Sequence, residues 1–201
     1  MRFSNGKKTR RQTSKKQNFG YDNLEDRRVL ATLVSFAGGD LSISMDANND
    51  ATFLTTAANG NVVVNGSQDV NSSVAGVQTA LASSVQSISI NGDASRAQQA
   101  VTLNSSYTQL DSISIQDVNR VMVNGVYETQ NLSVTLVGAD GEFIDTAGGR
   151  LRADGTTTIR ANNNNVLLDS ASNNFNVVDV ANGGTGRDIT CLLYTSDAAD
   201  E

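Results

Sequence analysis

The chain of 201 residues has no His, Trp or Pro and a single Cys, which excludes the usual zinc sites and the Ser-His and Cys-His catalytic dyads. Residues 1–28 hold nine basic and three acidic residues, whereas residues 29–190 hold six Arg and fifteen acidic residues. An acidic body is a poor partner for nucleic acid, whose affinity depends on neutralised phosphates, so we expect no nucleic-acid partner.

The first segment, residues 1–23, interleaves Lys and Arg with Ser, Thr, Gln and Asn and has no apolar periodicity. A segment of this kind has too little apolar surface to offset the entropy lost on ordering. We therefore predict a disordered basic leader over residues 1–23.

Residues 24–37 follow with the sequence LEDRRVLATLVSFA. A pattern Leu-Glu-Pro-Arg-x-Leu-Leu-Ala is matched at Leu24, Glu25, Arg27, Leu30 and Ala31. Asp26 stands in place of the Pro, and Val29 in place of the first Leu of the pair. Behind its basic leader, this segment resembles the N-terminal LEPR-x-LL segment of large secreted and surface proteins of planctomycete bacteria. The resemblance implies recognition by export machinery and an extracellular or cell-surface location.

The apolar content of the same segment is low for an export signal. Its apolar run, Val29 to Val34, is interrupted by Thr32 and is shorter than the roughly 7–15 residues of an ordinary signal peptide. No run in the chain approaches the roughly 18 apolar residues of a membrane span, so we expect none. The alternative to an export motif is a single amphipathic helical turn capped by Asn23.

The body, residues 38–190, is organised around a returning strand pattern, seen most clearly as Ser-Ile-Ser-Ile at residues 87–90 and 112–115. Apolar pairs two residues apart, the mark of a half-buried strand, recur every 21 to 26 residues. The pairs are Leu41/Ile43, Val62/Val64, Ile88/Ile90, Ile113/Ile115, Val134/Leu136, Thr157/Ile159 and Val178/Val180. Second apolar clusters lie between them, so the spacing predicts an all-β, right-handed parallel β-helix; β-sandwich-like repeats are the alternative.

Two stretches depart from this repeat. Asn59-Gly60 is a strong hairpin signal and predicts a local antiparallel pair between strands over residues 52–56 and 61–65. Within residues 71–85, Val74, Val77, Leu81 and Val85 fall at helical spacing behind residues that are good N-caps. This spacing predicts a short helix, or a long loop, inserted in one coil.

The end of the body is rich in Asn, a residue that tolerates left-handed backbone angles and suits solenoid corners at residues 162–165 and 173–176. Residues 166–184 resemble the β-strand repeats of filamentous-haemagglutinin-like surface proteins, which supports the coil interpretation. Residues 191–201, CLLYTSDAADE, resemble a translated sequencing adapter. That resemblance implies that the natural protein continues beyond Thr190 and that Cys191 has no functional meaning.

Calcium is the one cofactor for which the sequence offers candidates, and they are weak. Asp46, Asn48 and Asp50 place oxygens at alternate positions, as a calcium loop does, but the glycine and the closing glutamate of such a loop are missing. An Asx-rich turn is therefore the better interpretation. Asp188 ends a single Gly-Gly-x-Gly-x-Asp motif, which binds calcium only as stacked copies.

No catalytic set stands out. Some β-helix proteins cleave polysaccharides with carboxylates and Arg, and Asp111, Asp117 and Arg120 lie near one repeat. Nothing separates these three from solvated loop charges. The sequence favours a non-enzymatic N-terminal fragment of a large exported β-repeat protein, adhesive or structural, whose partner is a surface or matrix polysaccharide or protein. A secreted carbohydrate-active β-helix enzyme and a calcium-dependent repeat protein are the alternatives.

Overall fold

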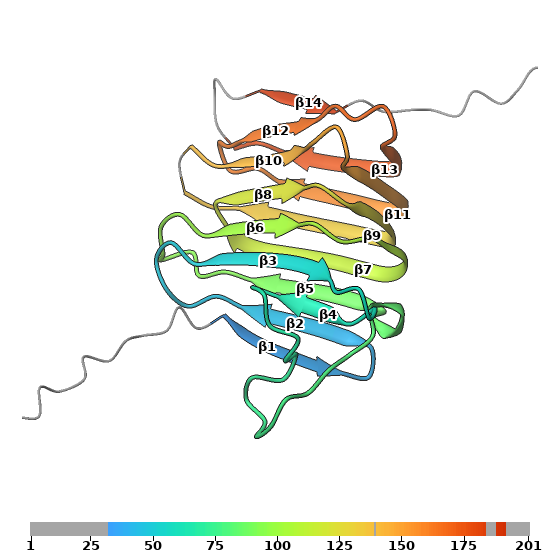
Figure 1. The fold of residues 1–201 in the computed structure, drawn as a ribbon. Helices are drawn as coiled ribbons and strands as arrows, with labels where there is room; N and C mark the ends of the chain where they lie inside the picture. Colours follow the sequence, from blue (N-terminus) through green and yellow to red (C-terminus); the bar gives the residue numbers. More distant parts are fainter. Residues whose placement is uncertain (1–31, 139, 184–187, 192–201) are drawn as a thin grey trace, which may run out of the picture.

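The computed structural model describes residues 32–138, 140–183 and 188–191, so the basic leader and the LEPR-x-LL-like motif lie outside the described residues. Strands dominate these ranges, and a 3-10 turn, η1 (Ala82–Ser84), accompanies them. The strands form two seven-stranded sheets that stack as a β-solenoid (Figure 1).

The first two strands of the chain begin sheet A and the next two begin sheet B, and from the fifth strand on the two sheets take alternate strands. Sheet A has the order β1 (Leu33–Ala37), β2 (Asp40–Ser44), β5 (Ser87–Asn91), β7 (Tyr107–Val118), β9 (Val126–Leu136), β11 (Arg150–Arg160), β13 (Asn174–Ala181). Sheet B has the order β14 (Ile189–Cys191), β12 (Asn165–Leu168), β10 (Glu142–Asp145), β8 (Arg120–Val123), β6 (Ala100–Leu103), β3 (Ala51–Thr56), β4 (Val62–Val64). Each coil therefore contributes one strand to each sheet, and the next coil stacks on it (Figure 1).

Consecutive coils pair in parallel, which confirms the β-helix prediction and excludes the sandwich alternative for the described residues. The two Ser-Ile-Ser-Ile copies lie directly on each other, with Ile88 opposite Ile113 and Ile90 opposite Ile115. Alternate side chains of a strand point to one side, so both apolar members of each pair enter the interior. All four of these isoleucines are buried. Small aliphatic layers of this kind explain why a chain with few aromatics can fold.

Sheet A is bent along the middle of its long strands β7, β9 and β11. In β9, the exposed neighbours Gln130 and Asn131 interrupt the alternation between buried Thr129 and Leu132. The pairing register of β9 with β7 and with β11 shifts around this point, as at a β-bulge. The bend divides sheet A into two walls, and residues 107–110, 126–129 and 150–153 make up the first of them.

The predicted hairpin is confirmed, whereas the helix predicted within residues 71–85 is wrong. β3 and β4 pair antiparallel across Asn59-Gly60. Of the four residues that suggested the apolar face of a helix, Val74, Val77 and Leu81 are 53%, 74% and 52% exposed, and Val85 alone is buried. With three of its four members outside the core, such a face gains little from being helical. The long-loop alternative is the one observed, with η1 near its end.

This loop closes both sheets at their N-terminal end. The backbone N–H of Val34 in β1 donates to Ser72 Oγ at 2.9 Å, and the N–H of Ser72 donates back to the Val34 carbonyl at 2.9 Å. On sheet B, the N–H of Val62 in β4 donates to the carbonyl of Ala80 at 2.8 Å. Unpaired strand edges recruit other chains, and the loop removes both edges from that risk.

Part of the segment predicted to serve in export, residues 24–37, pairs as a strand with the solenoid. Leu33–Ala37 forms β1, which lies antiparallel on β2 with Val34 opposite Ile43 and Phe36 opposite Leu41. Val34 is buried. β1 covers the edge of β2, so it belongs structurally with the solenoid and not with the export segment.

Two tyrosines of neighbouring coils in the first wall, Tyr107 and Tyr127, allow a test of how the solenoid interior is packed. The rings of Tyr107 and Tyr127 are 5.7 Å apart, and Tyr127 is fully buried, with its hydroxyl accepting a hydrogen bond from the N–H of Ser105 at 3.2 Å. Burial raises the pKa of the Tyr127 phenol. The unfolded chain therefore releases this proton first, near pH 10, and the folded state loses stability as the pH rises further.

We expect Tyr127 to remain un-ionised in an alkaline titration until the chain unfolds. The measurement is absorbance at 295 nm for the wild type and for Tyr127→Phe. The two curves should coincide around pH 10 and separate only at the pH of unfolding. If the substitution removes an ionisation step centred near pH 10, Tyr127 is accessible and this packing is wrong.

Candidate functional site

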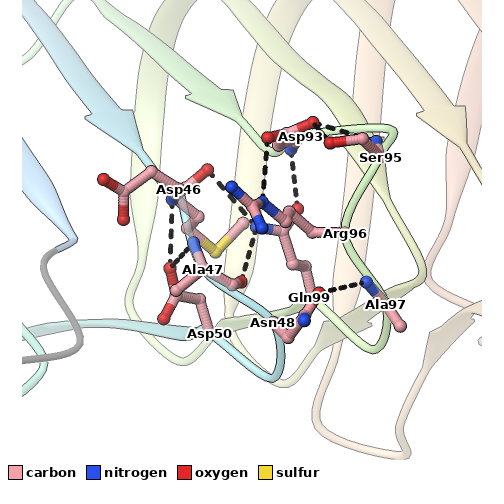
Figure 2. A network of polar contacts seen from close by, with 10 residues as sticks. Asp46, Ala47, Asn48, Asp50, Asp93, Ser95, Arg96, Ala97 and Gln99 are labelled. Atoms are coloured by element: carbon pink, nitrogen blue, oxygen red, sulfur yellow. Dashed lines mark hydrogen bonds and ion pairs between the residues drawn. The ribbon is translucent and has the colours of Figure 1, made fainter. Parts of the chain in front are cut away.

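Figure 2 shows two polar loops of consecutive coils meeting at the corner where sheet A passes into sheet B. Gln99, fully buried, joins them: its Nε2 donates to the carbonyls of Met45 at 3.3 Å and Ala47 at 3.1 Å. Its Oε1 accepts from the N–H of Asp93 at 2.7 Å. The side chain therefore satisfies three backbone groups from both loops, which fixes the geometry of this corner.

The same corner is held by amide side chains in the following coils. The N–H of Gln99 donates to Asn119 Oδ1 at 2.8 Å, and Asn119 Nδ2 donates to the carbonyl of Val137 at 2.9 Å. Further along, Asn164 Oδ1 accepts from the N–H of Gly141 at 2.6 Å. Each of these amides lies immediately before a strand of sheet B, so Asn164 occupies a corner, as the sequence predicts.

Two of the three candidate calcium ligands of the first loop, Asp50 and Asn48, accept hydrogen bonds from backbone N–H groups of this loop and of its neighbour. Asp50 Oδ2 accepts from the N–H groups of Asp46 at 3.0 Å and Ala47 at 2.8 Å. Asn48 Oδ1 accepts from the N–H of Ala97 at 3.0 Å. The Asp46 carboxylate points away from Asp50 (Figure 2). This arrangement is the Asx-rich turn that the sequence favours.

The fourth calcium candidate, Asp188, lies elsewhere. It precedes β14, and its backbone carbonyl accepts from the N–H of Val166 at 3.0 Å. At about 4.8 Å per coil, it is separated from the first loop by roughly 20 Å or more. Among the described residues, no three acidic, His or Cys side chains are grouped so that they could hold a metal ion. The structure does not bring the four candidates together.

Three of the five ion pairs among the described residues join neighbouring coils. Arg120 Nε lies 2.7 Å from Glu142 Oε1. Arg160 Nη2 lies 2.7 Å from Asp179 Oδ2, and its hydrogen bond lowers the pKa of that carboxyl group. Exposed pairs of this kind stabilise a fold weakly, but they neutralise the surface locally.

The three residues considered for catalysis are not brought to one site. Arg120 is paired with Glu142 of the next coil. Asp111 lies at the bend of β7, and Asp117, with a positive φ of 58°, lies near the end of the same strand. Six residues of extended strand separate these two carboxylates along the chain, a distance of about 20 Å.

Asp111 instead lines a groove of about 470 Å³ between the η1 segment and the first half of β7. One wall consists of Ala82, Ser83, Val85 and Gln86, and the other of residues 106–111. A second hollow of about 470 Å³ shares Ala82 and Ser106 and continues past Thr56 to Gly125. The two hollows therefore form one elongated depression, which we call the η1 groove.

The η1 groove exists because a 3-10 turn cannot pair with a strand. η1 makes its bonds within the turn, as in the Ser84 N–H to Leu81 carbonyl bond at 3.0 Å. One backbone bond crosses to β7, from the N–H of Asp111 to the carbonyl of Gln86 at 2.8 Å. The walls are joined at this end and stand apart along the rest of their length.

Five polar side chains of the first hollow are uncommitted, whereas Ser106 accepts from the N–H of Val126, and Thr56 and Ser105 in the second hollow bond to each other. None of the following makes a side-chain hydrogen bond or ion pair with another described residue: Ser83, Gln86, Thr108, Gln109 and Asp111. The side-chain amides of Gln99 and Asn164 differ, because backbone groups of the protein already satisfy their hydrogen bonds. Of the groove residues, sequence reasoning identified Asp111 alone, since Ser, Thr and Gln are common throughout this chain and carry no local signal.

Comparison with known proteins finds no matching family model, no similar curated protein and no similar solved structure. Within the described ranges, no helix is long and apolar enough to cross a membrane.

Proposed function

We propose that this chain is part of an exported β-solenoid of the cell surface or extracellular matrix, with an adhesive or structural role. The observation that supports this most directly is the parallel stack itself. Each coil adds a layer of small buried aliphatic side chains and leaves a polar outer surface, so the stack gives a stiff, extendable surface from few apolar residues. The likeness of residues 24–31 to an export motif supports the proposed location.

The geometry gives less support to an enzyme. Asp111, Asp117 and Arg120, the set considered for polysaccharide cleavage, lie apart. General acid–base or nucleophilic catalysis requires the acting groups within hydrogen-bond reach of one reacting centre. The uncommitted polar side chains of the η1 groove favour contact with a ligand over chemistry on it. An adhesive role uses that feature directly.

The location is tested by export of a reporter fused behind residue 191 in a planctomycete host. Replacing Leu24, Arg27 and Leu30 together by alanine should retain the reporter inside the cell, because the residues that match the export motif are lost. The measurement is the fraction of reporter cleaved by protease added to intact cells. Replacing Thr9, Gln12 and Ser14 by alanine is the matched control and should leave export unchanged. Equal export of both variants would remove the basis for a surface location.

A further inference from the structure

We propose that the η1 groove binds a neutral oligosaccharide, a stretch of an uncharged polysaccharide chain. This inference deepens the proposed surface function and rests on it for its biological setting. The observation that carries it is the convergence of uncommitted polar side chains from two segments, Ser83 and Gln86 on the η1 side and Thr108, Gln109 and Asp111 on β7.

The chemistry of these groups matches sugar hydroxyls. A Ser or Thr hydroxyl and a Gln amide can each donate and accept hydrogen bonds, as a sugar hydroxyl also does. The Asp111 carboxylate accepts only, and its two oxygens can receive two neighbouring hydroxyls of one ring. A ligand rich in hydroxyl groups satisfies all five side chains at once, whereas a ligand with isolated polar groups leaves several unpaired.

The charge of the η1 groove argues against an anionic ligand. No Lys, Arg or His belongs to the residues that line either hollow. The single charged group is the Asp111 carboxylate, which would repel uronic acids, phosphates and sulfates. The ligand is therefore an uncharged chain.

The lack of exposed apolar pockets in the η1 groove argues against a peptide ligand. Extended peptides gain specificity from pockets that accept alternate side chains. Tyr107 and Leu110, the large apolar residues of the lining, are only 4% and 3% exposed because they point into the solenoid interior. The walls therefore present hydroxyl and amide groups and offer no apolar pockets.

The shape of the η1 groove fits a chain ligand. The two hollows share Ala82 and Ser106, so the depression runs along β7 from Asp111 and then around the corner toward Gly125. The five strand residues 107–111 alone span about 16 Å, enough for about three sugar rings. One wall belongs to a strand whose other edge is paired with β9, so little ordering is needed when a ligand binds.

The test is isothermal titration calorimetry of the full chain with three probes: cellohexaose, β-1,4-mannohexaose and the anionic hexamer of α-1,4-galacturonate. We expect at least one neutral hexasaccharide to bind, and the double variant Gln109→Ala/Asp111→Ala to weaken this binding at least tenfold. Gln116→Ala is the matched control, because Gln116 is an exposed glutamine of the same strand outside the η1 groove. It should leave the affinity unchanged.

Thr108→Val, which removes a hydroxyl without changing the size of the side chain, gives a second measurement if the double variant fails to fold. It should weaken binding about threefold to tenfold. The inference is overturned if neither neutral probe binds at millimolar concentration, if only the galacturonate hexamer binds, or if the groove variants bind as the wild type does. The assay uses purified protein, so its failure is distinct from a failure of export in the reporter experiment.

Discussion

Gln99→Ala should lower the free energy of unfolding by about 3–5 kcal/mol. The substitution removes the partner of the Asp93 N–H and of the Met45 and Ala47 carbonyls, in a corner where the Gln99 side chain is fully buried. Each buried group left without a partner costs about 1–3 kcal/mol, and alanine leaves a cavity as well. Urea denaturation followed by circular dichroism measures the change.

Gln116→Ala is the control for this prediction. Gln116 is exposed, and its amide bonds to Ser114 Oγ at 3.2 Å on the outer surface. Its loss should change stability by no more than about 0.5 kcal/mol. Equal losses for the two glutamines would show that the corner is open to water, which would then replace the bonds of Gln99.

Gly125→Ala should destabilise the chain by about 4 kcal/mol or more, in the range reserved for severe core defects. A Cβ at this position would lie 1.6 Å from the carbonyl oxygen of Ser105 in the preceding coil. Backbone, unlike a flexible side chain, cannot turn aside, so the two coils must move apart. The N–H of Gly125 also donates to the Leu103 carbonyl at 3.1 Å, and that movement would strain the bond.

The melting temperature and the soluble yield of Gly125→Ala measure this effect. Gly148→Ala is the matched control at the same corner of the next coil, where the nearest atom to an added Cβ, the Asn124 carbonyl oxygen, is 3.4 Å away. That variant should lose no more than about 1 kcal/mol. A wild-type melting temperature for Gly125→Ala would mean that the coils are not in close contact here.

Period-2 patterns made the solenoid predictable, because Ile88 and Ile90 enter the interior for the same reason in every coil. The capping loop was not predictable from its own residues. Val74, Val77 and Leu81 have helical spacing, but nothing in that spacing shows that two sheet edges nearby need backbone partners. Long-range pairing decided the conformation of this segment and overrode its local preference.

The candidate sites, too, could not be predicted from local sequence alone. Oxygens at alternate positions, as in Asp46, Asn48 and Asp50, serve either to ligate calcium or to close a turn, and the residue types alone do not separate the two uses. The η1 groove depends on which coil contains a 3-10 turn opposite a strand. Only the stacking of Ala82–Ser84 against β7 reveals it.

The closed N-terminal end gives the solenoid a mechanical direction. The ladder bonds between coils run along its axis, so a load applied at β13 meets them one rung at a time. At the other end, β1 is fastened by the reciprocal bonds of Val34 and Ser72, which must break together. Under tension applied at β13 the stack should yield from β13 toward β1, and each coil of 21 to 26 residues should release roughly 70–90 Å of chain. A solenoid of this kind would unfold coil by coil under force, while its capped N-terminal end stays folded.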